Sequence, residues 1–212
     1  MAMNLVKLPT GKPNLQLRVS KGHYATSHSH INYYIDVTLT KFRLSEARAA
    51  AAELIRAYKA TTIVDTILCL DGTEVIGACM ASELTKSGYA NMNAHQTIYV
   101  VTPEHTTGSQ LIFRENTAPM IQNKHVLVLA ASVTTGYTVQ GAVEAIRYYG
   151  GEPAGVTAIF ATVDKCAGYP VASIFDPHDL PDYQSYDAHS CPWCKEGKKI
   201  DALVNSFGYS SL

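Results

Sequence analysis

The sequence predicts an α/β fold: a mostly parallel sheet flanked by helices, with an N-terminal strand region and an irregular C-terminal tail. Apolar runs of strand length alternate with helix-forming segments between residues 45 and 163, the order expected of βαβ units. From Lys165 onward Pro, Asp and Tyr become frequent, and regular structure is expected to thin out.

The N-terminal elements come first. Residues 15–19 and 33–37 are alternating or aromatic segments and are expected to be strands, separated by a polar turn over 21–32. A helix is expected over 45–60, because its alanines are strong helix formers and Ser45 can cap it.

The next segments continue the alternation. Residues 62–70 form a near-continuous apolar run, as expected of a buried parallel strand, and a turn and helix follow that Gly88 is placed to end. Residues 97–101 predict another strand. The segment 102–123 has no clean period, and a loop of that length in a compact domain is usually functional or mobile.

The last regular elements lie around a turn. Residues 125–130 predict a strand, 138–151 a helix with Gly150 at its end, and 155–163 a further strand. Parallel sheets bind ligands at the carboxyl ends of their strands. The strand ends at 70–73 and 130–138 are therefore the expected site.

Composition limits the possible partners. The chain has 212 residues, 47% apolar and 17% charged, with a formal net charge of -1, so it should be globular and has no electrostatic reason to bind nucleic acid or an anionic membrane. No apolar run has the length of a membrane helix, and the first residues lack the apolar core of a signal peptide. Five Cys, an odd number, favour reduced thiols and a cytoplasmic location.

The turn at 130–138 has the chemistry of a phosphate site. Small hydroxyl residues surround a Gly at the start of the predicted helix; the candidate residues are Ser132, Thr134, Thr135, Gly136, Tyr137 and Thr138. Free helical N–H groups, the helix dipole and the hydroxyls together could hold a phosphate monoester without Lys or Arg. The alternative is that Thr and Gly simply make a good turn and cap. No Asp or Glu occurs from His125 to Gln140.

Three segments resemble one family. VLVLAASVTTGYT (126–138) resembles the signature of type I phosphoribosyltransferases, SHINYYIDVTLTKF (29–42) is similar to the N-terminal stretch of the orotate branch, and CPWCKEG (191–197) resembles a C-terminal motif of many bacterial members. The resemblance implies one domain over 1–212, with a hood (1–44), a core (45–164) and a tail (165–212). It also implies a small phosphate ester such as phosphoribosyl pyrophosphate as ligand, and a homodimer.

Two departures from the family weaken the case for catalysis. The two acidic residues whose carboxylates accept hydrogen bonds from the ribose hydroxyls are replaced by Ala130 and Ala131. Such hydrogen bonds contribute roughly 1.5–3 kcal/mol each, so their loss should weaken ribose binding greatly. The family's loop Lys is also absent between residues 91 and 123, where His105 and Arg114 could only partly compensate.

The segment Leu70-Asp71-Gly72-Thr73-Glu74 resembles, by position, the family loop that approaches pyrophosphate. Asp71 and Glu74 could hold Mg²⁺ directly or through water. The favoured interpretation is a turn residue and a first-turn Glu stabilised by the helix dipole. Mg²⁺ stays possible as a cofactor.

Cys191 and Cys194 have the spacing of half a zinc site, with His189 two residues upstream. A fourth ligand could be Asp187, His178 or Cys166, none at a diagnostic distance. We do not expect Zn²⁺ there; a tight turn that packs the tail on the body is the preferred interpretation. The cluster His23, His28 and His30, with its H-x-H pair, is expected to be solvated rather than metal-bound.

Three functions follow from these observations. The first is orotate-type phosphoribosyl transfer with Mg²⁺, which the resemblance implies. The second is a binding or regulatory module that senses a nucleotide or sugar phosphate on the same fold, which the missing acids and Lys favour. The third is a structural role with the loop as a relic. One ring of the pair Tyr33 and Tyr34 could stack on a planar ligand.

Overall fold

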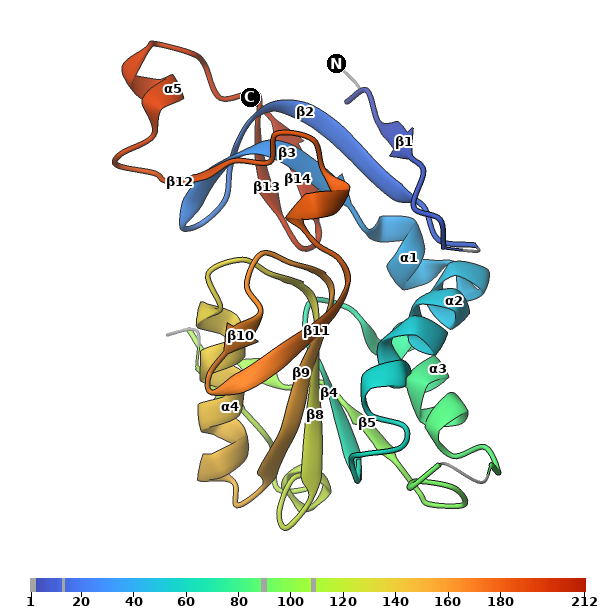
Figure 1. Ribbon diagram of the computed structural model, residues 1–212. Coiled ribbons are helices and arrows are strands. Elements are labelled where there is room, and N and C mark those ends of the chain that lie inside the picture. The colour runs from blue at the N-terminus through green and yellow to red at the C-terminus, as the bar shows by residue number, and fades with distance from the viewer. Residues whose placement is uncertain (1–2, 13, 89–90, 108–109) are drawn as a thin grey trace.

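The computed structural model describes residues 3–12, 14–88, 91–107 and 110–212. A core sheet lies below a second sheet, which contains strands of the predicted hood (1–44) and of the C-terminal tail, and from here on the name hood means this whole sheet (Figure 1). The core sheet has the order β10-β11-β9-β8-β4-β5, in which β11, β9, β8, β4 and β5 run parallel. Its strands are β4 (Thr66–Cys69), β5 (Tyr99–Val101), β8 (His125–Val133), β9 (Glu152–Ala161), β10 (Lys165–Cys166) and β11 (Tyr169–Phe175). The predicted α/β class is confirmed.

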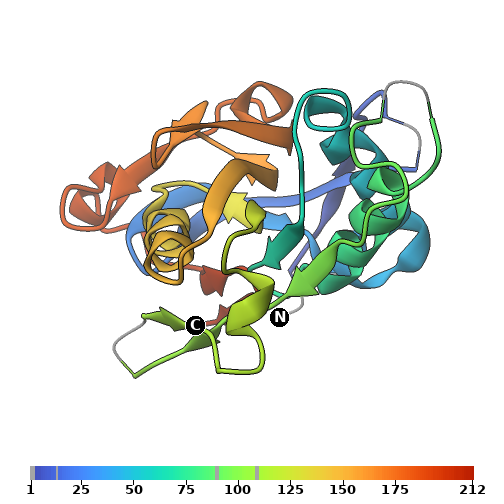
Figure 2. The same cartoon turned by 90° about the horizontal axis from the view of Figure 1, so that it is seen from below.

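Helices cover both faces of the core sheet (Figure 2). On one face, α2 (Leu44–Leu54) and α3 (Glu74–Leu84) share an apolar cluster with Leu127 and Leu129 of β8. On the other face, α4 (Tyr137–Tyr148) shares a second cluster with Val126 and Val128. Because side chains alternate along a strand, neighbouring residues of β8 face different helices.

The hood sheet combines both ends of the chain. Its order is β12-β3-β2-β13-β14, with β1 paired to β2. Its strands are β1 (Val6–Leu8), β2 (Leu17–Ala25), β3 (Ser29–Asp36), β12 (Ser185–Asp187), β13 (Ala202–Asn205) and β14 (Gly208–Ser211). The tail expected to be irregular is thus largely ordered: it supplies β10 and β11 to the core sheet and β12 to β14 to the hood.

Several predicted boundaries were wrong. The polar turn expected over 21–32 is mostly strand, since β2 runs to Ala25 and β3 begins at Ser29. Polar residues can occupy these strands because the C-terminal segment packs against them. The helix expected over 45–60 begins at Leu44, with Arg43 rather than Ser45 at its N-cap, and after Leu54 it tightens into a 3₁₀ turn, η1 (Ile55–Ala57).

Other boundaries moved by a few residues. Helix α3 ends at Leu84, before Gly88, while Gly150 does follow α4 with φ of 77°. Strand β8 continues to Val133, three residues past the predicted end, so Ala131 and Ser132 belong to the strand. The aperiodic segment 102–123 holds a small hairpin of β6 (Glu104–His105) and β7 (Leu111–Ile112), then η2 (Ala118–Met120).

Two charged contacts join the hood to the core. Arg18 of β2 forms a buried, two-pronged ion pair with Glu46 of α2. Lys41, in the short helix α1 (Thr38–Phe42), is 1% exposed and donates hydrogen bonds to the backbone oxygens of Asp71 and Ser206, each at 2.7 Å. Among the described residues, no helix combines the length and apolarity needed to span a bilayer.

Candidate functional site

A cavity of about 200 Å³ lies where the hood meets the carboxyl ends of the core strands. The core contributes the ends of β4, β8 and β9, and the hood contributes the β2–β3 turn, β3 and the β13–β14 turn. The residues that line the cavity include Thr26, Ser27, His28, Tyr33, Tyr34, Asp71, Ala131, Ser132, Thr134, Thr135, Thr138, Phe160, Tyr183 and Ser206.

The predicted phosphate loop opens into this cavity. Its turn requires Gly136, which has φ of 79° and is the N-cap of α4. A Cβ at this position would also lie 2.5 Å from Cys166 Sγ, so the loop packs closely on the β10 strand. The chain therefore turns sharply between β8 and α4, and the first turn of the helix is directed at the cavity.

The loop hydroxyls are available for a ligand. No side chain of the described residues caps α4. Within the described ranges, the hydroxyls of Thr134, Thr135 and Thr138 make no intramolecular hydrogen bond, whereas that of Thr73 donates to backbone oxygens. A threonine that served only the turn or the cap would bond the backbone. These hydroxyls therefore face the cavity as free donors beside uncapped helical N–H groups.

The hood places further polar groups opposite the loop. Thr26, Ser27 and His28 form the turn between β2 and β3 and line the same cavity. The His28 ring lies against the Tyr137 ring of α4, with 5.2 Å between centroids. The ring N–H of an exposed imidazole at this rim can donate a hydrogen bond to an anion. The sequence had placed His28 in a solvated cluster, and only the folded hairpin shows its neighbours.

The two positions of the missing acids are both buried but have different neighbours. Ala131 is 0% exposed and lines the cavity, whereas Ala130 is 1% exposed and packs in the apolar cluster beneath α4. The alternation of β8 produces this difference. A carboxylate at 131 would thus reach a ligand, and one at 130 would point into the core cluster.

One carboxylate does reach the cavity, from Asp71 at the end of β4. Its Oδ2 accepts a hydrogen bond from the Ala131 N–H at 3.3 Å, and its Oδ1 accepts one from the Ser206 hydroxyl at 3.0 Å. Glu74 does not join it: its Oε1 accepts from the Thr102 hydroxyl at 3.0 Å. Thr73 is fully buried and bonded to the backbone. Of the predicted pyrophosphate segment, Asp71 lines the cavity, whereas the neighbouring Gly72, whose φ is 75°, does not.

Lys41 was missed by the sequence reasoning, although it lies within a segment that resembles the family. Its ammonium group holds the Asp71 and Ser206 carbonyls together behind the cavity wall. Burial lowers the pKa of Lys41, and the charge of Asp71 opposes that shift. An alternating pattern could not reveal it, because its partners lie 30 and 165 residues away.

The two basic candidates of the long loop lie elsewhere. Arg114 donates three hydrogen bonds to Glu104 on the exposed β6–β7 hairpin, and this contact holds the pKa of Glu104 below its usual range. His105 is exposed on the same hairpin. Neither residue lines the cavity.

Aromatic rings form the remaining wall. Tyr33 and Tyr34 of β3 both line the cavity, together with Phe160 and Tyr183. Burial raises the pKa of Tyr34 and of Tyr183 to about 12, so both keep their protons at neutral pH. These rings provide an apolar surface of the kind that planar groups stack on.

The C-terminal Cys pair lies apart from the cavity lining. Cys191 and Cys194 meet His23 and His30 of the hood, whereas the exposed His189 is outside this group and its N–H bonds Asp187 Oδ1 at 2.9 Å. The sequence had named His189 as the accompanying ligand because it is near in the chain. The histidines that do approach the pair lie more than 160 residues away in the sequence.

No protein-family profile matches the sequence. Among solved structures, the orotate phosphoribosyltransferase of Mycobacterium tuberculosis superposes with a TM-score of 0.53 at 19% identity, over 77% of this chain and 92% of that one. A phosphoribosyltransferase of Corynebacterium diphtheriae gives 0.52 at 22% identity, over 76% and 90%. The adenine phosphoribosyltransferase of Trypanosoma brucei gives 0.52 at 15%, over 76% and 78%. This chain has the type I phosphoribosyltransferase fold.

Proposed function

We propose that this protein binds a phosphorylated ribose compound, such as phosphoribosyl pyrophosphate or a nucleotide, and does not transfer its ribosyl group efficiently. The observation that carries the proposal is the set of hydroxyls of Thr134, Thr135 and Thr138, which have no hydrogen-bond partner in the described part of the chain, at the start of α4. A helix N-terminus with added hydroxyl donors suits the doubly charged end of a phosphate monoester.

The rest of the cavity suits the remainder of such a ligand. Its hydroxyl-rich turn and its aromatic wall match a sugar and a planar base in kind. Two similar structures contain ligands of this class: one of the M. tuberculosis enzyme holds phosphoribosyl pyrophosphate, and that of the T. brucei enzyme holds AMP, pyrophosphate and ribose-5-phosphate. These ligands indicate the class to test first.

Weak catalysis follows from what the cavity lacks. Transfer requires the ribose to be oriented and the departing pyrophosphate to be neutralised. Ala131 supplies no carboxylate to the ribose, and neither Arg114 nor His105 lines the cavity. A protein that anchors the phosphate and leaves these tasks undone acts as a sensor or regulator of the ligand.

Phosphoribosyl transfer is the second candidate, and Asp71 is the observation in its favour. It is the acidic residue of the cavity lining in the described part of the chain, and it lies beside Ala131. With lone pairs left over, its carboxylate could accept ribose hydroxyls or contact Mg²⁺ that a pyrophosphate brings. Because Glu74 is directed to Thr102, Asp71 is the carboxylate of this segment that we propose for such an ion.

Calorimetric titration tests the proposal. The native chain should bind ribose-5-phosphate, nucleoside monophosphates and phosphoribosyl pyrophosphate, and Thr135→Val should weaken binding by roughly tenfold, the equivalent of one hydrogen bond. Thr61→Val, an exposed site outside the cavity, is the matched control and should bind normally. Absence of binding to every phosphate ester would overturn the proposal.

A product assay separates the two candidates. The native chain is incubated with phosphoribosyl pyrophosphate, Mg²⁺ and orotate, uracil, adenine or hypoxanthine. Binding without product supports the sensor, and rapid nucleotide formation establishes the transferase. The homodimer and the cytoplasmic location stay predictions.

A further inference from the structure

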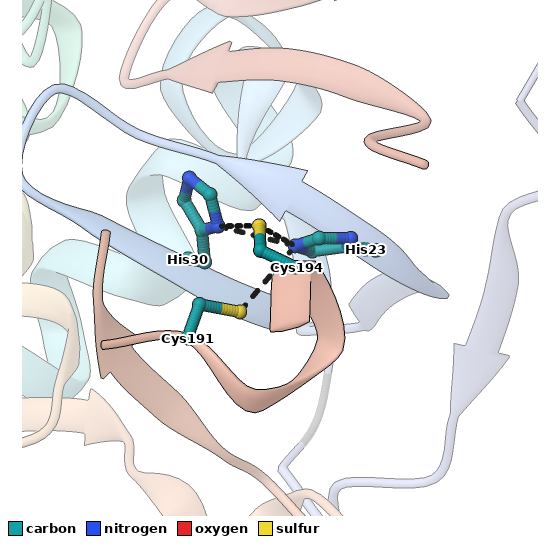
Figure 3. A group of neighbouring side chains, drawn as sticks. All are labelled: His23, His30, Cys191 and Cys194. Atoms are coloured by element: carbon teal, nitrogen blue, oxygen red, sulfur yellow. Dashed lines mark hydrogen bonds between the residues drawn. The ribbon is translucent and has the colours of Figure 1, made fainter. Parts of the chain in front are cut away.

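Four side chains from opposite ends of the chain meet in the hood (Figure 3): His23, His30, Cys191 and Cys194. One ligand atom from each lies within 4.8 Å of all the others. We propose that these four residues bind a structural Zn²⁺ that fastens the β2–β3 hairpin to the C-terminal segment.

Four of the six separations among the ligand atoms are close to those of a tetrahedral zinc site, and the other two are within 4.8 Å. His23 Nε2 lies 3.1 Å from His30 Nδ1, Cys191 Sγ lies 3.6 Å from His23 Nε2, and Cys194 Sγ lies 3.7 Å from His23 Nε2 and 3.3 Å from His30 Nδ1. Zn–N bonds of about 2.0 Å and Zn–S bonds of about 2.3 Å place the ligand atoms of a tetrahedron about 3.3 Å (N to N) and about 3.5 Å (N to S) apart.

The hydrogen bonds of His23 fix the tautomer in which Nε2, the ring nitrogen that faces the other three residues, is free to bind a metal. Its Nδ1 lies 3.0 Å from the carbonyl oxygen of Lys198 and 3.1 Å from that of Lys199. Carbonyl oxygens only accept, so Nδ1 carries the proton and Nε2 presents a lone pair to the group. A backbone carbonyl that fixes the tautomer in this way is the usual outer partner of a metal-bound histidine.

A β-bulge places the two histidines on one face. Lys21 pairs with Tyr33, but Tyr24 pairs with Ile31, so one extra residue is inserted between them in β2. Since Ala25 opposes His30, alternation puts His23 on the same face as His30. In an unbulged ladder His23 would point to the opposite face.

Gly22 makes this bulge possible. A Cβ at Gly22 would lie 2.7 Å from both the Tyr24 ring and the Asp201 carboxylate. The Asp201 Oδ2 accepts a hydrogen bond from the His23 N–H at 2.7 Å, which fixes the bulged residue from the C-terminal side. The irregularity is therefore held in place on both sides of His23.

The Cys pair comes from the connection between β12 and β13. Because β12 pairs with β3 and β13 pairs with β2, this connection has to cross the hairpin, and the short helix α5 (Pro192–Lys195) lies on the way. Its Trp193 ring packs edge-on against His23, with 5.3 Å between centroids. Three of the four ligands are buried and Cys194 is exposed.

The ligand set favours zinc in a closed site. Two thiolates and two neutral imidazoles neutralise and saturate a tetrahedral Zn²⁺, and mixed N₂S₂ tetrahedra are typical of that ion. With four protein ligands, no position stays open for water or substrate, which is the mark of a structural site. The zinc would join His23 to Cys191, which is 168 residues away in the sequence. It would thereby anchor the β2–β3 hairpin, whose turn from Thr26 to His28 lines the cavity.

Metal analysis tests the site. The native chain, expressed with zinc and purified under reducing conditions without chelator, should contain about one zinc per molecule. His30→Ala and Cys194→Ser should reduce the zinc content to background. Cys79→Ser and His189→Ala are the matched controls, since neither residue belongs to the group, and both should retain the metal.

A second measurement covers variants that fail to fold. Native protein stripped of metal and titrated with Co²⁺ should develop the visible bands of a tetrahedral site and the ultraviolet bands of thiolate–cobalt bonds, and Zn²⁺ should displace them. A native chain that holds no zinc and takes up neither Zn²⁺ nor Co²⁺ overturns the proposal, as does full zinc content in Cys194→Ser. These readouts do not depend on phosphate binding.

Discussion

The buried ion pair between β2 and α2 gives the sharpest stability prediction. Arg18 Nη2 donates to Glu46 Oε1 at 2.8 Å and Nη1 to Oε2 at 2.9 Å, and the two side chains are only 7% and 8% exposed. The change is Glu46→Ala. It would leave the guanidinium buried, with Gln16 Oε1 at 3.4 Å as its remaining side-chain acceptor.

The expected loss follows from that burial. Breaking one partner of a buried pair typically destabilises a protein by about 3–5 kcal/mol, because the other charge stays desolvated and unpaired. The matched control is Glu53→Ala in the same helix. Glu53 Oε2 lies 2.9 Å from Arg56 Nη1, and the Arg56 side chain is 73% exposed. An exposed pair of this kind contributes about 0–1 kcal/mol.

Urea unfolding, followed by fluorescence and circular dichroism, measures both variants. Glu46→Ala should lower the unfolding free energy several times more than Glu53→Ala. The double variant Arg18→Met, Glu46→Ala should recover part of the loss, because no buried charge remains. Equal effects of the two single changes, or no recovery in the double variant, would refute the reasoning.

Three further predictions concern the cavity and its walls. Ala131→Asp should tighten the binding of phosphoribosyl pyrophosphate measured by calorimetry, because it adds a carboxylate inside the cavity. Ala130→Asp should instead lower the unfolding free energy by about 3 kcal/mol or more, because its carboxylate enters the apolar cluster. Gly136→Ala should destabilise the chain by about 1–3 kcal/mol, since φ is 79° and the new Cβ meets Cys166 Sγ, and Cys166→Ala should relieve the steric part in urea unfolding. Burial lowers the pKa of Lys41, so the unfolded chain binds the Lys41 proton more tightly than the folded chain does. The unfolding free energy of the native chain, relative to that of Lys41→Met, should therefore rise with pH from the lowered pKa to about 10.4. A difference in unfolding free energy that does not change with pH would contradict the shift.

Local patterns were enough to predict the central strands of the core sheet, although not β10 and β11. The apolar runs of β4, β8 and β9 and the helix-forming segments of α2 and α4 carry the periods of their structures, and the α/β class follows from their order. The phosphate loop was equally local, because hydroxyls, Gly136 and the start of α4 are adjacent in the chain. Its residues could therefore be named before any fold was known.

In the hood, only parts of β2 and β3 could be predicted in this way. Residues 21–32 read as a polar turn, yet His23 and His30 lie in strands because the segment around Cys191 and Cys194 covers them. A bulge shifts the strand period by one residue and leaves no clear mark in a polar sequence. The short strands of the tail gain their partners only across the fold, so their sequences show no period of their own.

The place of β13 in the hood determines the order in which the two sheets can fold during translation. Strands β4, β5, β8 and β9 are all synthesised by residue 161, so this part of the core sheet can form while translation continues. The hood is completed later, because β13 can pair with β2 as its parallel neighbour only after residue 205 has left the ribosome. Throughout that interval one edge of β2 is without its final strand, and the nascent chain is then most exposed to wrong pairing.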